Sequence, residues 1–409
     1  YFDPEKIVPD IRPNQESGTV DIEYQLVEKS SSQFDLSGGI GNGYVIFQAG
    51  ISLTNFSTQK FFNKKAWNPF PIGDGQKLSL RVHTNGDYYN AVSLSFTEPW
   101  LGGKKPNALS VGVYYSYQDD GFWNTSGQSE YHVGILGGSV SLATRLKWPD
   151  DYFTFVHGIA YQQYNVKNYS TLTAMPTGIS NNINYNFTIA RNSVDQLIYP
   201  RQGSDVSLQA QMTFPYSLVN GKDYSNLTSQ ERYKWLEYYK VNVRAAWYFN
   251  LFDDLVVSTR ARFGFLGQYN SNVGYSPFER FYVGGDGLTG YNLDGRELVA
   301  LRGYDESSLS PDGGGMVFDK YTMELRYPIT LNEGASVYAL AFFEAGNSWA
   351  NFQSFEPFKM YRSLGVGLRI HMPMFGLLGV DWGYGLDAIP GDPTASGSHF
   401  HISINNSID

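Results

Sequence analysis

The chain has 409 residues, of which 42% are apolar and 17% are charged, with a formal net charge of -9. Aromatic residues reach 16%, glycine is abundant at 43 residues, and cysteine is absent. These values exclude a disulfide scaffold and a thiolate metal site, argue against nucleic acid as a partner, and leave no apolar run near the roughly 18–20 residues of a membrane helix.

A chain that is rich in Tyr, Phe and Gly and has no apolar helix suits a membrane β-barrel. In such a barrel, outward apolar residues alternate with inward polar residues, and aromatic girdles mark both membrane interfaces. The alternative on composition is a large secreted β-sandwich or propeller.

The first thirty residues differ from the rest. The chain begins with Tyr1 and carries no signal peptide, which indicates a processed or excised piece. A single amphipathic strand is predicted within residues 18–29, where apolar positions alternate with polar ones: Val20, Ile22, Tyr24 and Leu26. Thirty residues are too few for an independent core. We therefore predict that residues 1–30 end a larger soluble domain and that residues 31–409 form the barrel.

From residue 34 onward the chain is a series of segments with a period of two. In the clearest, 205–214, Val206, Leu208 and Met212 share one face, opposite Gln209 and Gln211. Their lengths suit tilted strands that cross a bilayer. The predicted strands are 34–41, 45–54, 76–84, 89–98, 108–118, 131–145, 152–165, 184–193, 203–214, 236–249, 255–266, 319–328, 336–346, 362–371, 376–386 and 398–405.

The connections between these segments sort by length. Sixteen is an even number, as single-chain bacterial barrels prefer, and such barrels have long external loops and short periplasmic turns. If residue 34 starts on the periplasmic side, the long connections fall outside, including 267–318. The exception is 55–75, an apparent periplasmic insertion that contains Phe61, Phe62, Trp67 and Phe70. A sandwich would not show this asymmetry, so we predict an all-β, sixteen-stranded antiparallel transmembrane barrel.

No catalytic motif is found. The sequence has no Gly-x-Ser-x-Gly elbow, phosphate loop or His-Glu-x-x-His. His399 and His401 could form a metal pair on one strand face, but two ligands without a nearby carboxylate or cysteine make a poor site. We predict that the histidines are polar residues of the lumen or interface, and that the chain is neither an enzyme nor a cofactor-binding protein.

The most unusual stretch is Phe281–Glu306, a glycine-rich interval that reads as neither strand nor tight turn. Loops this long in a compact fold are usually functional or disordered, and its aromatic and aliphatic residues argue against disorder. Arg302 stands within it, and alternation predicts that Glu324 points inward and that Glu344 points inward near the outer rim. The planar fork of arginine can serve two carboxylates. From these residues alone two interpretations are equally open. Either Arg302 docks the loop in the lumen by pairing with both glutamates, or the three residues are unrelated charges of the lumen.

Five motifs, in order, resemble those of one family. Phe281-Tyr282-Val283-Gly284-Gly285 followed by Leu301-Arg302-Gly303-Tyr304 is similar to the sixth-loop signature of the BamA-type outer-membrane assembly superfamily. The others are the Tyr-Pro-x-x-Gly turn at 199–203, Phe342-Phe343-Glu344-Ala345-Gly346, the segment 96–100, and residues 19–41, which resemble the close of a POTRA domain. Leu301 replaces the usual Val or Ile, Glu344 replaces the usual Asp, and the chain lacks a terminal Phe or Trp.

This resemblance implies a site and a mechanism. Arg302, with Gly303 and Tyr304, would be the loop tip docked against Glu324 and Glu344. The first and last strands would meet at a weak seam that opens sideways. The sequence supports a weak seam, since interior glycines weaken a strand and the last strand is short. The seam residues are Phe34, Leu36, Gly38, Gly39 and Gly41 with Phe400, Ile402 and Ile404.

The resemblance also implies a location and partners. The chain would lie in the outer membrane of a Gram-negative bacterium, contact lipopolysaccharide and phospholipid, and insert unfolded outer-membrane protein clients with accessory periplasmic or lipoprotein subunits. The alternative is a secretion transporter of the same superfamily that passes polypeptide through its lumen, because fold alone does not choose function. An ordinary porin, with a loop that merely constricts the pore, is the third reading.

Overall fold

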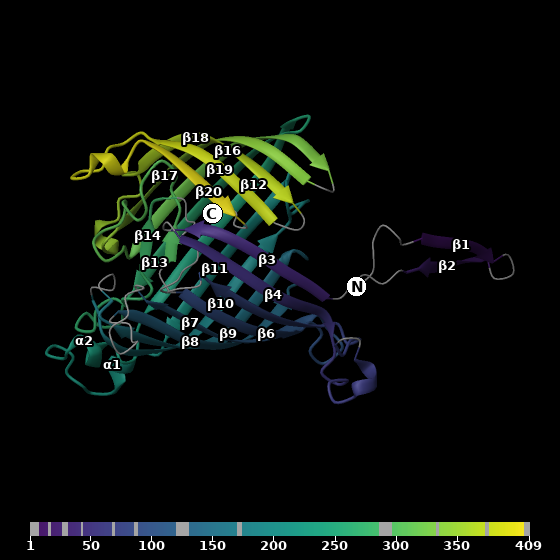
Figure 1. Ribbon diagram of the computed structural model, residues 1–409, viewed down its shortest axis with the longest axis horizontal. Coiled ribbons are helices and arrows are strands. Elements are labelled where there is room, and N and C mark those ends of the chain that lie inside the picture. The colour runs from purple at the N-terminus through teal and green to yellow at the C-terminus, as the bar shows by residue number, and fades with distance from the viewer. Residues whose placement is uncertain are drawn as a thin grey trace.

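The computed structural model describes most of the chain. The described residues are 8–14, 18–26, 32–41, 44–67, 70–85, 89–119, 131–169, 174–285, 297–332, 335–372 and 376–404. They are dominated by one large antiparallel sheet that curves around an interior (Figure 1). The predictions of an all-β chain and of antiparallel pairing are confirmed.

Strands of the sheet are neighbours in the order in which they follow along the chain, except where β13 pairs with β16 across a long loop. From one edge to the other they are β3 (Ser32–Gly41), β4 (Tyr44–Phe56), β5 (Gln76–Thr84), β6 (Tyr89–Glu98), β7 (Asn107–Asp119), β8 (His132–Arg145), β9 (Phe153–Lys167), β10 (Gly178–Asn192), β11 (Gly203–Thr213), β12 (Tyr239–Phe252), β13 (Leu255–Gly267), β16 (Val317–Asn332), β17 (Ala335–Trp349), β18 (Tyr361–Met372), β19 (Gly376–Gly385) and β20 (Ser398–Ile404).

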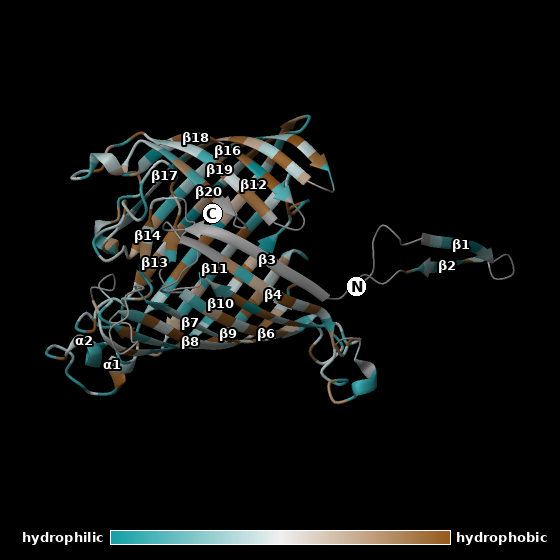
Figure 2. Ribbon diagram, viewed as in Figure 1, coloured by the Kyte–Doolittle hydropathy of each residue, from teal (hydrophilic) through white to brown (hydrophobic). Residues whose placement is uncertain are grey.

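Alternation along each strand separates two faces of the sheet. Leu208 of β11 pairs with Val243 of β12, which pairs with Phe263 of β13, while the intervening Gln209 pairs with Asn242. The hydropathy colouring changes from residue to residue along these strands (Figure 2). Cross-strand pairs of this kind are the unit of sheet stabilisation, and the two-residue period fixes which residues face the interior.

Strand β10 begins six residues earlier than predicted, at Gly178 rather than residue 184. Its first residues, Gly-Ile-Ser-Asn-Asn-Ile, are mostly small or polar, so the sequence gives little apolar signal. The structure holds this extension in register with β9, from Gly178↔Val166 onward. A side-chain bond from Asn182 Nδ2 to the Tyr238 hydroxyl, 3.0 Å, adds support from the adjoining loop.

Except for the connection between β4 and β5, the long connections gather at one end of the sheet, opposite the end from which the N-terminal segment leaves (Figure 1). The connection from β11 to β12 carries two short helices, α1 (Tyr216–Val219) and α2 (Ser229–Arg232). Single 3-10 turns occur at Lys64–Ala66, Phe352–Ser354 and Pro393–Ala395. Within the described part of the chain, no helix has the length and apolarity to cross a membrane.

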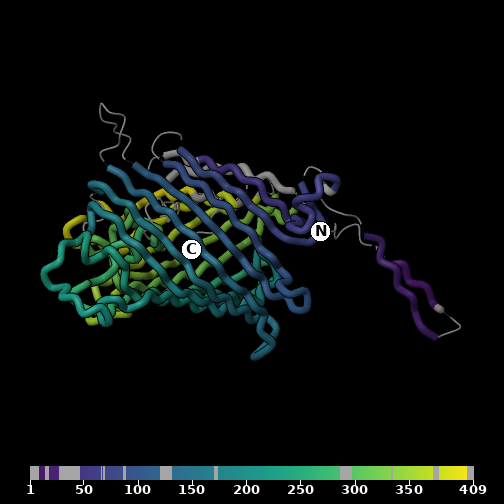
Figure 3. Tube along the Cα trace, turned by 90° about the horizontal axis from the view of Figure 1, so that it is seen from below, coloured from purple at the N-terminus to yellow at the C-terminus, as the bar shows by residue number. Residues whose placement is uncertain are grey.

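The N-terminal segment is a hairpin rather than the predicted single strand. β1 (Val8–Asn14) pairs with β2 (Thr19–Gln25), with Ile11 opposite Ile22. β1 was not predicted because it contains Pro9 and Pro13, and proline is confined to edge strands and strand ends. This hairpin stands apart from the large sheet in two perpendicular views (Figures 1 and 3), and its assignment to a larger domain stays a prediction.

The long loop between β13 and β16 lies against the inner wall of the sheet. Contrary to prediction it contains two three-residue strands, β14 (Phe281–Val283) and β15 (Glu297–Val299), which pair in parallel. Apolar loop side chains join wall residues in one buried cluster that includes Phe278, Phe281, Val283, Val299, Leu301, Tyr304, Val317 and Phe318. The loop is therefore packed as part of the core.

Candidate functional site

The tip of the loop is a fully buried arginine surrounded by three carboxylates. Arg302 Nη2 lies 2.9 Å from Glu344 Oε1 and 3.0 Å from Glu324 Oε1, and Nη1 lies 3.3 Å from Asp381 Oδ1. Its backbone N–H also donates to Glu344 Oε2 at 2.9 Å. The guanidinium carbon is 3.5 Å from the centre of the Phe342 ring. We call this group the tip anchor: Arg302, Glu324, Phe342, Glu344 and Asp381.

Three strands supply these partners because of their register. Thr322 of β16 is opposite Glu344 of β17, so Glu324 and Glu344 both point to the interior two residues apart along the wall. The Thr322 hydroxyl donates to Glu344 Oε1 at 3.2 Å, and Arg326 Nε donates to Glu324 Oε2 at 2.8 Å. Both glutamates therefore have hydrogen-bond partners other than Arg302 that fix their positions.

Gly303 permits the tip to approach the wall closely. Its φ of +88° lies in the left-handed region, and an added Cβ would stand 2.7 Å from the backbone nitrogen of Gly385. The facing β19 residues, Gly383 and Gly385, likewise have no side chain to obstruct the tip. Only glycine combines this conformation with such close backbone contact.

The tip also contacts the last strand. Gly303 N–H donates to His401 Nε2 of β20 at 3.1 Å, and the Gly303 carbonyl accepts from Gly397 N–H at 3.2 Å. Next along the loop, Asp305 N–H donates to the Ala395 carbonyl at 2.8 Å. The Tyr304 hydroxyl donates to the Arg362 carbonyl at 2.6 Å. The loop tip thus connects the inner wall to the last strand of the sheet.

Cations outnumber carboxylates around the tip anchor. Arg260 and Arg326 pair with Glu324, Lys320 lies 3.1 Å from Glu344, and Arg369 lies 2.9 Å from Asp381. Burial by itself opposes the charge of Arg302, but Glu344, Glu324 and Asp381 together raise its pKa. The Arg302 side chain donates three hydrogen bonds to carboxylates, and each hydrogen bond to a charged group contributes about 1.5–3 kcal/mol. The arrangement can therefore lock the loop in place.

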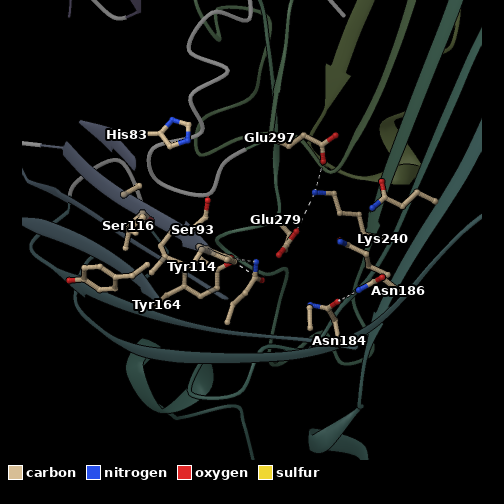
Figure 4. A pocket seen from close by; sticks show the side chains of 18 of the residues that line it. His83, Ser93, Tyr114, Ser116, Tyr164, Asn184, Asn186, Lys240, Glu279 and Glu297 are labelled. Atoms are coloured by element: carbon tan, nitrogen blue, oxygen red, sulfur yellow. Dashed lines mark hydrogen bonds and ion pairs between the residues drawn. The ribbon is translucent and has the colours of Figure 1, made fainter. Parts of the chain in front are cut away.

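A second group fixes the two limbs of the same loop. Lys240 Nζ of β12 lies 2.6 Å from Glu297 and 3.3 Å from Glu279, which stand on opposite limbs (Figure 4). The Tyr238 hydroxyl donates to Glu279 at 3.1 Å, and Asn242 Nδ2 donates to Glu297 at 3.3 Å. Burial raises the pKa of Glu297, but Lys240 more than offsets this and leaves the pKa lowered. We call these residues the limb anchor.

A cavity of about 580 Å³ adjoins the limb anchor. Its lining is mostly neutral and polar, and Figure 4 shows these side chains arranged around one hollow. The polar lining residues include Ser93, Tyr114, Ser116, Gln162, Asn184, Asn186, Gln209, Gln211 and Asn242. The interior thus has a buried, charged wall on one side and a hollow lined mostly by neutral polar side chains on the other.

Several of these residues were missed from sequence. Asp381 and His401 reach Arg302 and Gly303 only because β19 and β20 lie close to the wall, and no spacing in the chain announces this. Lys240 could have been found, since it shares the inward face of β12 with Asn242. His399 lies 3.4 Å from Asp305, and its ring stacks on that of His401, so both predicted polar histidines face the loop.

The seam residues lie on the two edge strands of the sheet. Phe34, Leu36, Gly38, Gly39 and Gly41 are in β3, whose backbone alone is described. On β20 the side chains of Phe400 and Ile402 are exposed, and Ile404 ends the strand. β3 and β20 lie side by side, yet in the described residues each pairs in register with only one neighbour, β4 or β19.

Comparison with known proteins identifies relatives of this arrangement. Residues 72–407 match the model of the Omp85 superfamily domain. The chain is similar to BamA from Haemophilus ducreyi lacking POTRA domains 1–3, with a TM-score of 0.63 and 17% identity over 97% of this chain and 74% of that chain.

Two structures of CdiB also share the fold. The one from Acinetobacter baumannii has a TM-score of 0.54 and 15% identity over 98% of this chain and 65% of that chain. The one from Escherichia coli has a TM-score of 0.57 and 13% identity over 97% of this chain and 66% of that chain. The chain therefore spans slightly less than two-thirds of each CdiB.

Proposed function

The chain belongs to the Omp85 superfamily, and we propose that it folds unfolded β-barrel clients and inserts them into the outer membrane of a Gram-negative bacterium. In this proposal β3 to β20 close into a sixteen-stranded transmembrane barrel, and residues 1–30 end a POTRA domain. The chain is not an enzyme. Its work is the pairing of strands rather than the making or breaking of covalent bonds.

The observation that carries the proposal is the loop tip, which holds β20 from inside. Arg302 is fixed to β16, β17 and β19, and Gly303 is bonded to His401 of β20. The other side of β20, toward β3, has no registered partner within the described residues. An unpaired strand edge is a template for another strand, and adding a strand to such an edge is a common mode of peptide recognition.

The edge strands favour this seam as the site of opening. β20 has seven residues, against sixteen in β16. Gly38, Gly39 and Gly41 stand inside β3, where glycine weakens a strand because it has no side chain to pack. Parting β3 from β20 therefore costs less than parting any two strands of the inner wall. A client strand would enter between them by backbone hydrogen bonding.

The partners follow from this mechanism. Clients are unfolded outer-membrane proteins, and accessory periplasmic or lipoprotein subunits deliver them. Outward apolar residues such as Leu208, Trp247 and Met323 are exposed, which suits contact with the lipopolysaccharide and phospholipid of the membrane.

A secretion transporter is the second candidate, and the neutral hollow favours it. Amide and hydroxyl side chains such as Asn184 and Gln209 could solvate an extended polypeptide passing through the lumen. Passage would require the loop to leave the interior, since its limbs are bonded beside this hollow through Lys240. The buried tip anchor opposes such movement, which is why we place assembly first.

Reconstitution of the full-length protein in lipid vesicles distinguishes the candidates. An unfolded barrel client held by a soluble chaperone is added outside, and its folding is followed by heat-modifiable electrophoretic mobility and protease protection. Assembly predicts a folded client in the vesicle membrane. An unfolded client protected inside the vesicle would instead identify a secretion transporter, and steady conductance with no client movement would identify a porin.

A further inference from the structure

The connection between β4 and β5 is an ordered unit at the end of the sheet from which the N-terminal hairpin departs (Figure 1). Its two arms are joined by backbone bonds from Ser57 N–H to the Pro71 carbonyl and from Gly73 N–H to the Asn55 carbonyl, both 2.9 Å. The Lys60 ammonium donates to the Ile72 carbonyl at 3.0 Å. These bonds, with one from Thr58 N–H to the Gln76 side chain of β5 at 2.7 Å, hold the connection against the ends of β4 and β5.

This ordered connection exposes aromatic side chains. The ring centroid of Phe61 lies 5.3 Å from that of Phe62 and 5.6 Å from that of Trp67. Trp67 Nε1 donates a hydrogen bond to the Phe61 carbonyl at 3.0 Å. Phe62 is nevertheless 92% exposed and Trp67 is 40% exposed. A single exposed apolar residue needs no explanation, but a held group of three is typical of an interaction surface.

The same surface is basic, although the whole chain is acidic. The described part of this connection contains the exposed Lys60, Lys64 and Lys65 against a single acidic residue, Asp74, whose carboxylate accepts from the Ser57 hydroxyl at 2.5 Å. The next turn at this end, between β6 and β7, repeats the pattern with exposed Trp100 and with Lys104 and Lys105. We call these two connections the basic aromatic rim: Lys60, Phe61, Phe62, Lys64, Lys65, Trp67, Trp100, Lys104 and Lys105.

Other connections at this end are neutral or acidic. The turn between β10 and β11 carries Asp195, Arg201 and a highly exposed Leu197, and the turn between β12 and β13 carries Asp253 and Asp254. Exposed apolar side chains thus occur in several connections at this end, whereas the lysines are concentrated beside β4 to β7. The basic charge is a property of one sector.

The basic aromatic rim continues the apolar outer surface of the sheet. Leu80 of β5 pairs with Leu94 of β6, and Val82 pairs with Val92; all four are exposed. The β4–β5 connection projects sideways beyond this surface rather than over the interior (Figures 1 and 2). Aromatic side chains favour the membrane interface, and lysines beside it attract anionic lipids.

We propose that the basic aromatic rim binds the headgroups of anionic phospholipid in the leaflet that faces the periplasm. The aromatic side chains enter the interface and the five lysines contact lipid phosphates. This inference rests on the proposed function only in placing the sheet across an outer membrane. It does not depend on client assembly or on the seam.

The test measures lipid binding to the full-length protein in detergent micelles by native mass spectrometry. Phosphatidylglycerol and phosphatidylcholine are titrated separately against the wild type and against Lys60→Gln/Lys64→Gln/Lys65→Gln. The matched control removes three lysines from the long connections at the other end: Lys222→Gln/Lys234→Gln/Lys359→Gln. Heat-modifiable mobility verifies that each variant is folded.

We expect the wild type to prefer phosphatidylglycerol, and the rim variant to lose its affinity for this lipid more than tenfold, because each lysine near an anionic surface contributes about 1 kcal/mol. The control variant should retain the preference. Phe62→Ser should weaken binding of both lipids alike. Equal loss in the rim and control variants, or no lipid preference in the wild type, would overturn the proposal.

The result is separable from the proposed function. A rim variant that loses phosphatidylglycerol but still assembles clients in phosphatidylcholine vesicles supports both proposals. A wild type that shows the lipid preference but assembles no client supports the lipid site and contradicts assembly. Rim-dependent capture of an acidic soluble protein, without any lipid preference, would mean that the surface binds protein instead.

Discussion

The inner wall and the edges of the sheet differ in the number of backbone pairs and side-chain contacts that stabilise them. β16 and β17 pair along nearly their whole length, from Val317↔Trp349 to Asn332↔Ala335, and carry the buried charges that fix the loop. β20 pairs in register with β19 only from Leu378↔Ile404 to Tyr384↔Ser398, and its side-chain contacts with the loop come from His401 and His399. The molecule is therefore strongly held where the loop docks and weakly held where a client strand could enter.

Loss of the tip arginine should have the largest effect on this contrast. Arg302→Ala removes the side-chain hydrogen bonds to Glu324, Glu344 and Asp381. Because hydrogen bonds to charged groups contribute about 1.5–3 kcal/mol each, we expect a loss of about 3–5 kcal/mol in loop docking. Protease sensitivity of the 267–318 loop and heat-modifiable mobility measure it. Arg302→Lys should retain only part of the docking free energy, because a lysine cannot reproduce the planar fork of the guanidinium.

Arg280→Ala is the control for that change. Arg280 lies in the same loop but donates to the Gly313 carbonyl rather than to the tip carboxylates. If Arg302→Ala left the loop as protease-resistant as Arg280→Ala does, the tip anchor would not be what holds it.

Close approach at the tip is tested by Gly303→Ala. The residue has a left-handed backbone, and the new Cβ would meet the backbone of β19, so we expect a cost above the roughly 1–2 kcal/mol of the conformation alone. Gly221→Ala isolates the conformational part, since Gly221 has a φ of +66° and open space around it. Equal losses in thermal unfolding would show that contact with β19 adds nothing.

Substitution in the limb anchor should cost less stability than substitution in the tip anchor. Lys240→Met removes the cation between Glu279 and Glu297, but Glu297 is partly exposed, so the loss should lie between about 1 kcal/mol for an exposed pair and 3 kcal/mol for a buried one. The limbs should gain protease sensitivity while the tip stays docked. The double variant Lys240→Met/Glu297→Gln should lose less than the sum of the single variants, and full additivity would argue against direct pairing.

The smallest effect is expected at the edge strand. His401→Leu removes the acceptor for the Gly303 N–H, and a hydrogen bond of this kind contributes about 1 kcal/mol. Faster amide hydrogen exchange in β20, with no change in β16, is the expected readout. His401→Gln keeps an acceptor and should restore slower exchange; if it behaves like leucine, packing rather than the hydrogen bond is responsible.

Much of this architecture could be predicted from sequence. The strands at 76–84 and 89–98 match to the residue, because clear alternation is bounded by turn residues. Inward positions for Glu324 and Glu344 followed from the same alternation. Asp381 and His401 could not be assigned to the site, since their approach to Arg302 and Gly303 depends on where distant strands lie around the sheet. Side-chain alternation gives the face of a strand but not its neighbours across the interior.

The central claim is that clients enter between β3 and β20, and locking this seam tests it most directly. The chain has no cysteine, so one cysteine in β3 and one in β20, chosen from a small panel for complete crosslinking, form a single defined link. The control pair replaces Leu364 and Tyr384, which are registered partners on β18 and β19. Assembly through the seam predicts that the β3–β20 link stops client insertion, that reduction restores it, and that the control link has no effect. Client insertion that continues at the wild-type rate with the β3–β20 link complete would contradict the claim.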